Sequence, residues 1–153
     1  MSATTEKSTL QRVLEIARAE TGTKEMQGKS TNPRILEYHQ TTKLKAVSDE
    51  VAWAAAFVNW VLKQAGIEGT DSSLARSFLR WGSPLRSPVP GCIVILKRGP
   101  APFGHVAFFV RRAQAGFIEA LGGNQADQVK ISAYRESDVL GYRVPDSTNE
   151  VKD

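Results

Sequence analysis

Residues 49–65 read DEVAWAAAFVNWVLKQA, and this stretch predicts the central helix of the fold. Its apolar residues recur three to four positions apart, which is the spacing of one buried helix face. Ser48 or Asp49 is a suitable N-cap for such a helix. Residues 54–56 are three alanines, so another element can approach the start of the helix closely.

The start of this helix is also a favourable place for a nucleophilic thiol. Backbone N–H groups and the helix dipole stabilise a thiolate there. The stretch contains no thiol, and Cys92, the single cysteine of the chain, begins a later apolar run, where burial as a small hydrophobic residue is expected. One cysteine excludes an internal disulfide and CxxC metal sites.

The segment WAAAFVNW at 53–60 resembles the nucleophile helix of the CHAP-type and NlpC-like cell-wall hydrolases of the papain superfamily. In that family Trp-Cys opens the helix and Phe-Val-Asn-Trp follows. Other segments match in the same order: Asn32-Pro33, Tyr38, Gly69-Thr70, Ala75, Ser77, Gly104-His105-Val106, Gly122-Gly123-Asn124-Gln125 and Gly141-Tyr142-Arg143-Val144-Pro145. The resemblance covers about residues 10–145, and Ala54 stands where the family has its catalytic cysteine.

The resemblance implies an α+β, papain-like fold in which N-terminal helices pack on a C-terminal antiparallel sheet. It also implies hydrolysis of an amide bond of peptidoglycan by a cysteine endopeptidase or amidase, without a metal or cofactor. The implied catalytic positions are Ala54 (the nucleophile position), His105 and Asn124, and the implied substrate contacts are Trp53, Gly104 and Gln125.

His105 opens a predicted strand, in which it shares a face with Ala107 and Phe109. An imidazole beside the central helix would take the proton of a thiol and return it to the leaving amine. The alternative is an ordinary half-buried histidine. The other histidine, His39, lies in a polar segment and is expected at the surface.

A cysteine hydrolase needs a further group that holds the imidazole in one tautomer. The resemblance implies Asn124 for this role, although Asn also fits a simple turn in the segment GGNQ. Many relatives carry a Glu two residues before this Asn, where this chain has Gly122. Glu119 is the nearest carboxylate, so Asn124 and Glu119 both remain candidates.

Ala54 allows two interpretations. If it is the natural residue, the chain is a pseudoenzyme that binds cell wall without turnover. If it replaces a cysteine, the chain is an inactivated enzyme. The sequence fits a phage endolysin or, as a second setting, a secreted antibacterial amidase effector.

Composition and charge limit the number of domains and the classes of binding partner. The 153 residues are 41% hydrophobic and 24% charged, which fits one globular domain, expected as a monomer. The net charge of +4 favours an anionic partner such as wall polymer, and no nucleic-acid-binding motif is present.

No apolar run reaches the roughly 20 residues of a membrane span. The N-terminus lacks the apolar region of a Sec signal peptide, so synthesis in the cytoplasm and action on the wall by another route are expected.

The remaining elements follow from periodicity and capping residues. Helices are predicted over residues 9–21 after Ser8, from Pro33 after Asn32, and over 74–81; strands are predicted over 92–96, 105–110, 116–121, 129–131 and 141–144, the last at an edge. The Pro-rich residues 83–91 are expected to form a loop. The predicted organisation is a flexible N-terminus (1–8), one domain (9–145) and a solvated tail (146–153).

Overall fold

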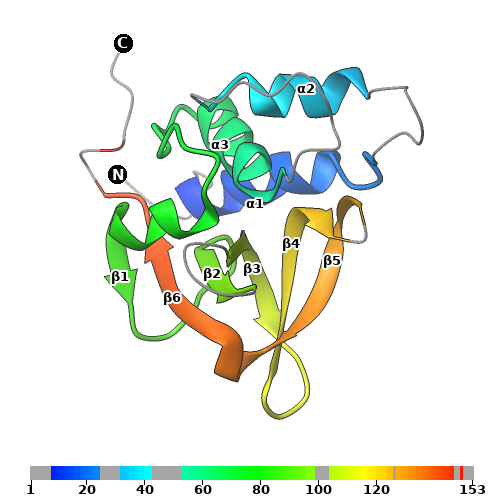
Figure 1. Cartoon of the computed structure of the whole chain (residues 1–153). Coiled ribbons are helices and arrows are strands. Elements are labelled where there is room, and N and C mark those ends of the chain that lie inside the picture. The colour runs from blue at the N-terminus through cyan, green and yellow to red at the C-terminus, as the bar shows by residue number, and fades with distance from the viewer. Residues whose placement is uncertain are drawn as a thin grey trace.

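The computed structural model of the chain describes residues 8–24, 32–42, 53–98, 104–125, 127–146 and 149. In this part of the chain, helices lie on one side of a six-stranded antiparallel sheet (Figure 1). The helical elements are α1 (Thr9–Ala19), α2 (Pro33–His39), α3 (Ala54–Gln64) and the 3₁₀ helices η1 (Ala75–Arg80) and η2 (Glu136–Asp138). The strands are β1 (Ser83–Leu85), β2 (Ile93–Lys97), β3 (Gly104–Arg112), β4 (Phe117–Gln125), β5 (Gln128–Arg135) and β6 (Val139–Val144). The predicted α+β class is confirmed. None of these helices is long and apolar enough to cross a membrane.

The first two helices begin at the capping residues that the sequence predicts. The Ser8 hydroxyl accepts a hydrogen bond from the Gln11 amide at 3.1 Å, and the Gln11 side chain accepts one from the Ser8 amide at 3.0 Å. This pair is a capping box, which stabilises a helix by satisfying two backbone donors at once. Asn32 caps α2 by accepting from the Arg34 amide at 2.8 Å.

The central helix α3 is shorter than predicted. It begins at Ala54, and its N-cap is Trp53, which makes no side-chain capping hydrogen bond. The predicted start at residue 49, with Ser48 or Asp49 as the cap, is therefore wrong; residues 43–52 lie outside the described residues. The helix ends as predicted, because Gly66 follows it with a φ of +77°.

The sheet has the strand order β1-β6-β2-β3-β4-β5, which corrects two predictions. The Pro-rich stretch is not only a loop, since Ser83–Leu85 forms β1 and pairs with β6. Strand β6 is consequently an inner strand and not an edge. Proline lacks an N–H donor and is tolerated on an edge strand, so Pro84 fits the short outer strand β1.

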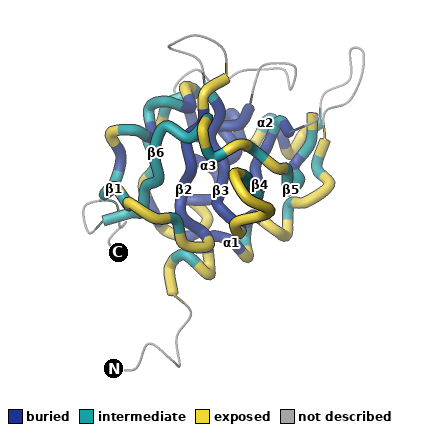
Figure 2. Tube along the Cα trace, turned by 90° about the horizontal axis from the view of Figure 1, so that it is seen from below, coloured by how far each residue is buried: buried dark blue, intermediate teal, exposed yellow. Residues whose placement is uncertain are grey.

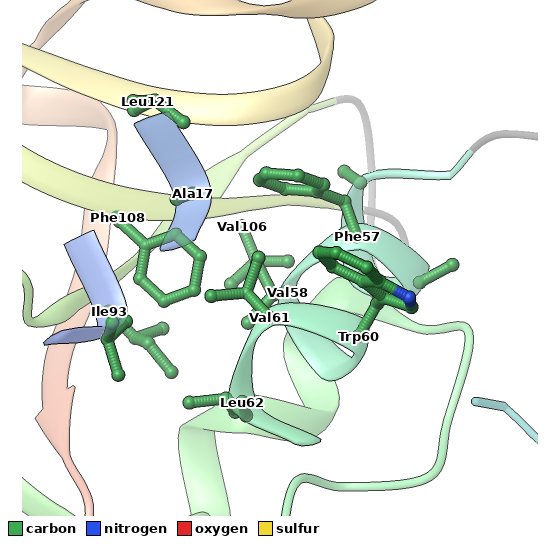
Figure 3. Packing of buried hydrophobic residues seen from close by; sticks show 14 of the residues in the cluster. Ala17, Phe57, Val58, Trp60, Val61, Leu62, Ile93, Val106, Phe108 and Leu121 are labelled. Atoms are coloured by element: carbon green, nitrogen blue, oxygen red, sulfur yellow. The ribbon is translucent and has the colours of Figure 1, made fainter. Parts of the chain in front are cut away.

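Two apolar clusters fill the two faces of the sheet. The larger one joins the helices to side chains such as Ile93, Val106 and Phe108, and Figure 3 shows these together with side chains of α3. The smaller one contains only sheet-side residues, among them Leu96 and Ala107. In Figure 2 the tube is dark blue, and so buried, along α3 and the middle strands. Because β2 and β3 are covered on both faces, they read in the sequence as continuous apolar runs.

Two further expectations need correction. His39 is 1% exposed, so its predicted surface position is wrong. Asn149, within the predicted solvated tail, contacts the domain: its carbonyl accepts a hydrogen bond from the Glu68 amide at 2.6 Å. The domain therefore includes at least part of the segment after Pro145.

Candidate active site

A cavity of about 290 Å³ lies at the N-terminus of α3. Its lining residues are Ala54, Ala55, Ser73, Ala75, Arg98, Gly104 and Asn124. They come from the first turn of α3, the η1 region, the residue after β2, the first residue of β3 and the end of β4. Segments distant in sequence thus meet here, and three predicted site positions, Ala54, Gly104 and Asn124, line one cavity.

Two larger cavities lie elsewhere in the described part of the chain. One, of about 400 Å³, lies between Leu10 of α1 and Val144 of β6, and the other, of about 390 Å³, lies beside Lys63 of α3. Neither borders a predicted site residue. We assign the candidate active site to the smaller cavity because a helix N-terminus, an arginine and the ends of β3 and β4 converge there.

Trp53 holds α3 against the sheet and does not line the cavity. The indole is fully buried and stacks on Tyr38, with ring centroids 5.8 Å apart. It also lies against Gly123, where an added Cβ would come within 2.6 Å of the indole. The predicted direct contact between Trp53 and substrate is therefore not what the structure shows. Its packing instead fixes the position of the helix start.

His105 points to the face of the sheet away from the helices. It pairs in register with Leu96 of the smaller cluster, whereas its neighbour Val106 belongs to the helix-side cluster. The imidazole is 1% exposed, and its centroid lies 5.5 Å from that of Tyr134. Among the described residues His105 is not a lining residue, although the adjacent Gly104 is. The sequence predicted that His105 approaches position 54 directly. The structure does not show this approach.

Two contacts link the imidazole to its surroundings. Nε2 lies 2.8 Å from Oε1 of Gln125. Nδ1 lies 3.3 Å from a guanidinium nitrogen of Arg98. Since Arg98 also lines the cavity, it connects the buried histidine to the cavity in which Ala54 lies.

The hydrogen bonds of Gln125 determine the histidine tautomer. The side-chain amide nitrogen of Gln125 donates to the Ala120 carbonyl at 3.2 Å and to the Lys130 carbonyl at 2.6 Å. The oxygen of this amide therefore faces the imidazole and accepts a proton from Nε2–H. Nδ1 then carries a lone pair, which accepts a hydrogen bond from Arg98. This is the neutral tautomer in which Nδ1 is the basic atom.

Burial keeps His105 neutral. Desolvation lowers its pKa to about 4, opposed by the hydrogen bond to Gln125 and assisted by the positive charge of Arg98. Burial has the opposite effect on the thiol of Cys92, whose pKa rises to about 11 because the charged form is the thiolate. Cys92 is fully buried, as expected from its apolar strand.

A bulge at the end of β4 decides which side chain reaches the histidine. Gly122 faces Ala107 on the histidine side, and Gly123 faces Trp53 on the helix side. Regular alternation would next put Asn124 on the histidine side. The register of β4 and β5 instead shifts between Gly122 and Gln125, and Asn124 has a φ of +57°. Such a bulge re-aims side chains, so Gln125 reaches the histidine and Asn124 lines the cavity.

Gln125 thus makes the side-chain contact with Nε2 of His105, and neither predicted candidate makes it. Asn124 lies on the cavity wall. Glu119 forms an ion pair with Arg111 at 2.6 Å. Gln125, predicted as a substrate contact, is 2% exposed and acts on the histidine. The bulge could have been predicted from the sequence GGNQ, because Asn tolerates a positive φ and two glycines favour a bulge.

The described residues show no cluster of three or more His, Cys, Asp or Glu side chains that could hold a metal ion. The cavity is lined by a guanidinium, two neutral polar side chains and a helix N-terminus, and the neutral imidazole of His105 contacts that guanidinium.

Comparisons with known proteins agree with this fold. No family model matches the sequence, and no curated protein matches it. Among solved structures, the chain is similar to a lipoprotein-like NLP/P60 family protein from Staphylococcus aureus (TM-score 0.55, 13% identity, covering 93% of this chain and 43% of that one). It is also similar to the P60 domain of antigen MAP1204 from M. avium subspecies paratuberculosis (TM-score 0.56, 14% identity, covering 90% of this chain and 93% of that one). The chain therefore has the α+β fold of these NLP/P60 structures and spans less than half of the staphylococcal protein.

Proposed function

We propose that this domain is built to hydrolyse an amide bond of peptidoglycan by a cysteine peptidase or amidase mechanism, and that the chain with Ala54 is its inactive form. The observation that carries the proposal is the cavity at the start of α3, with Ala54 on one side and, through Arg98, a histidine held in a single tautomer on the other. The NLP/P60 fold and the sequence resemblance support the wall as substrate.

A cysteine at position 54 would complete the chemistry. When Arg98 turns away from Nδ1 of His105 and the imidazole approaches position 54, the thiol would transfer its proton to Nδ1, and the thiolate would attack the carbonyl carbon of the amide. The tetrahedral oxyanion would lie near the backbone N–H groups at the start of α3, which lack partners within the helix. The imidazolium would then protonate the leaving amine as the C–N bond breaks. Water would hydrolyse the remaining thioester with the same imidazole as base.

Substitution Ala54→Cys tests the proposal. The variant should release new amine termini and muropeptides from purified peptidoglycan, whereas the chain with Ala54 should release none. Ala55→Cys is a matched control, because Ala55 also lines the cavity but lies one residue further along the helix. Absence of products from Ala54→Cys, with native folding retained, would reject the proposal.

A second candidate function is wall binding without turnover. Ala54 itself favours it, because the cavity retains Arg98 and two polar side chains but lacks a nucleophile. The chain with Ala54 should then be retained by insoluble peptidoglycan, and salt should weaken this retention if charge dominates. Retention of the chain together with an inactive Ala54→Cys variant would favour this second function.

A further inference from the structure

Arg98 occupies a position that the proposed chemistry does not explain. It follows the last residue of β2, lines the cavity beside Ala54, and donates to Nδ1 of His105 at 3.3 Å. Arg98 is an exposed residue, whereas the histidine is buried. Its guanidinium thus contacts both the cavity and the buried imidazole.

The contact with Nδ1 opposes the action of His105 as a base. A lone pair that accepts a hydrogen bond from a guanidinium is not available for a thiol proton. Nε2 offers no alternative, because its proton is donated to Gln125. The base is therefore blocked in this arrangement and becomes available only when Arg98 moves away from Nδ1.

Among the described lining residues, no carboxylate is present to hold the guanidinium elsewhere. Arg98 is the one charged side chain among the described lining residues, and Ser73 and Asn124 are neutral groups that can donate hydrogen bonds. Other arginines of the described chain have carboxylate partners, as Arg111 has Glu119 and Arg112 has Glu136. No ion pair to a carboxylate is found for Arg98 within the described residues.

A carboxylate is the ligand that these donors fit. A guanidinium binds a carboxylate through two parallel hydrogen bonds, and such charge-assisted bonds are stronger than a bond to a neutral imidazole. Ser73 and Asn124 also line the cavity, and their side chains contain neutral hydrogen-bond donors.

We propose that Arg98 binds a carboxylate group of the substrate in this cavity and, in turning to it, releases Nδ1 of His105 to act as the base. The inference rests on the proposed function and adds to it a substrate feature and a means of activation. A substrate that carries a carboxylate near the scissile amide both fills the cavity and frees the base. Arg98 is a positioning and specificity residue in this account, and it takes no part in bond making.

The binding step is tested on the chain as it is, with Ala54. N-acetylglutamate and its neutral counterpart N-acetylglutamine are the probes, and the ¹⁵N resonances of the His105 imidazole are the readout. N-acetylglutamate should shift the Nδ1 resonance in a saturable manner, and N-acetylglutamine should not. Arg98→Met should abolish the response, whereas the control Arg111→Met, on β3, should retain it. Equal responses to both probes, or a response that survives Arg98→Met, would overturn the inference.

The activation step is tested in the Ala54→Cys variant with two alkylating reagents, anionic iodoacetate and neutral iodoacetamide. Arg98→Met should lower the ratio of the iodoacetate rate to the iodoacetamide rate by about tenfold, since a hydrogen-bonded charge is lost. The iodoacetamide rate itself should rise, because Nδ1 is no longer blocked. A merely structural role would lower both rates together and would overturn the inference.

If Ala54→Cys hydrolyses peptidoglycan and Arg98→Met leaves that activity and the reagent ratio unchanged, this inference fails while the proposed function stands. A probe response that requires Arg98, with no hydrolysis by Ala54→Cys, would support the carboxylate site and reject the proposed function.

Discussion

The helix side and the sheet side of the cavity differ sharply in chemical content. The helix side presents Ala54 and Ala55, two methyl groups at the start of α3. Behind the sheet side, His105 is held between Gln125 and Arg98 by hydrogen bonds at both ring nitrogens. The helix side contributes two methyl groups and a helix dipole, and the sheet side has behind it an imidazole with a hydrogen bond at each ring nitrogen.

The difference indicates that the polar cluster is not there for stability. Burying polar groups costs free energy unless every partner is present, and an apolar cluster of similar shape would stabilise the sheet as well. Gln125 uses all three of its hydrogen-bonding contacts to keep one proton on Nε2. Such control of a tautomer is what the proposed proton transfer requires.

The largest expected effect is the loss of hydrolysis rate when the imidazole behind the sheet side is removed. In the Ala54→Cys variant, His105→Ala should reduce the rate of peptidoglycan hydrolysis by about 10²- to 10⁴-fold, the usual contribution of a general base. The rate of release of amine termini measures it. Arg111→Ala, an exposed change on the same strand, serves as the control. Hydrolysis that persists without the imidazole would show that the sheet side is not catalytic.

The second effect concerns the cost of keeping His105 neutral. In the folded chain its pKa is about 4, whereas the ordinary value is 6.5. Between these values the unfolded chain binds more protons, so the free energy of unfolding falls as the pH is lowered, by about 3 kcal/mol for this group. Urea unfolding at neutral pH and at about pH 4.5 measures this, and His105→Gln should remove this part of the pH dependence. An unchanged pH dependence would place the imidazole in solvent.

Adjacent glycines provide the third test, because each faces one side. Gly123→Ala would press on Trp53 and Phe57 and should cost about 2 to 3 kcal/mol in unfolding free energy. Gly122→Ala would press on Ala107 and on Oε1 of Gln125, each 2.8 Å from the new Cβ. Only Gly122→Ala should also shift the Nε2–H resonance of His105. The same NMR response from both variants would argue against separate sides.

The smallest expected effect concerns Glu119. Its partner Arg111 has a side chain that is 62% exposed, so Glu119→Gln should change the unfolding free energy by less than about 1 kcal/mol. In the Ala54→Cys variant it should leave hydrolysis unchanged, because Gln125 and not Glu119 contacts the imidazole. A large loss of activity would restore Glu119 as the orienting group.

The sequence predicted the helices and most strands because their patterns are local. The capping box at Ser8 and the Asn32-Pro33 start needed no tertiary information. The start of α3 was predicted five residues early, at 49 instead of 54, because acidic residues before a helix suit its dipole whether or not the helix extends to them. Strand β1 was missed because edge pairing tolerates the prolines that usually indicate a loop.

The sequence predicted which residues line the cavity better than it predicted the contacts that they make. Ala54, Gly104 and Asn124 do meet at one cavity. The exchange of roles between Asn124 and Gln125 was not predictable from alternation, because one bulged residue at positive φ reverses the faces of all that follow. Arg98 was also missed as a site residue, since only the folded chain brings it to both Nδ1 and the cavity.

We propose the start of α3 as a nucleophile site, and the reactivity of a thiol placed there measures this property. In Ala54→Cys, the helix N-terminus should hold the pKa of the new thiol below the free-cysteine value of about 8.5. Burial raises the pKa of Cys92 to about 11, so that thiol should stay unreactive. Near pH 6, iodoacetamide should therefore label position 54 first, and faster in the native than in the unfolded protein. Labelling that follows Cys92, or a thiol at position 54 that reacts no faster when folded, would show that the start of α3 does not activate a thiol.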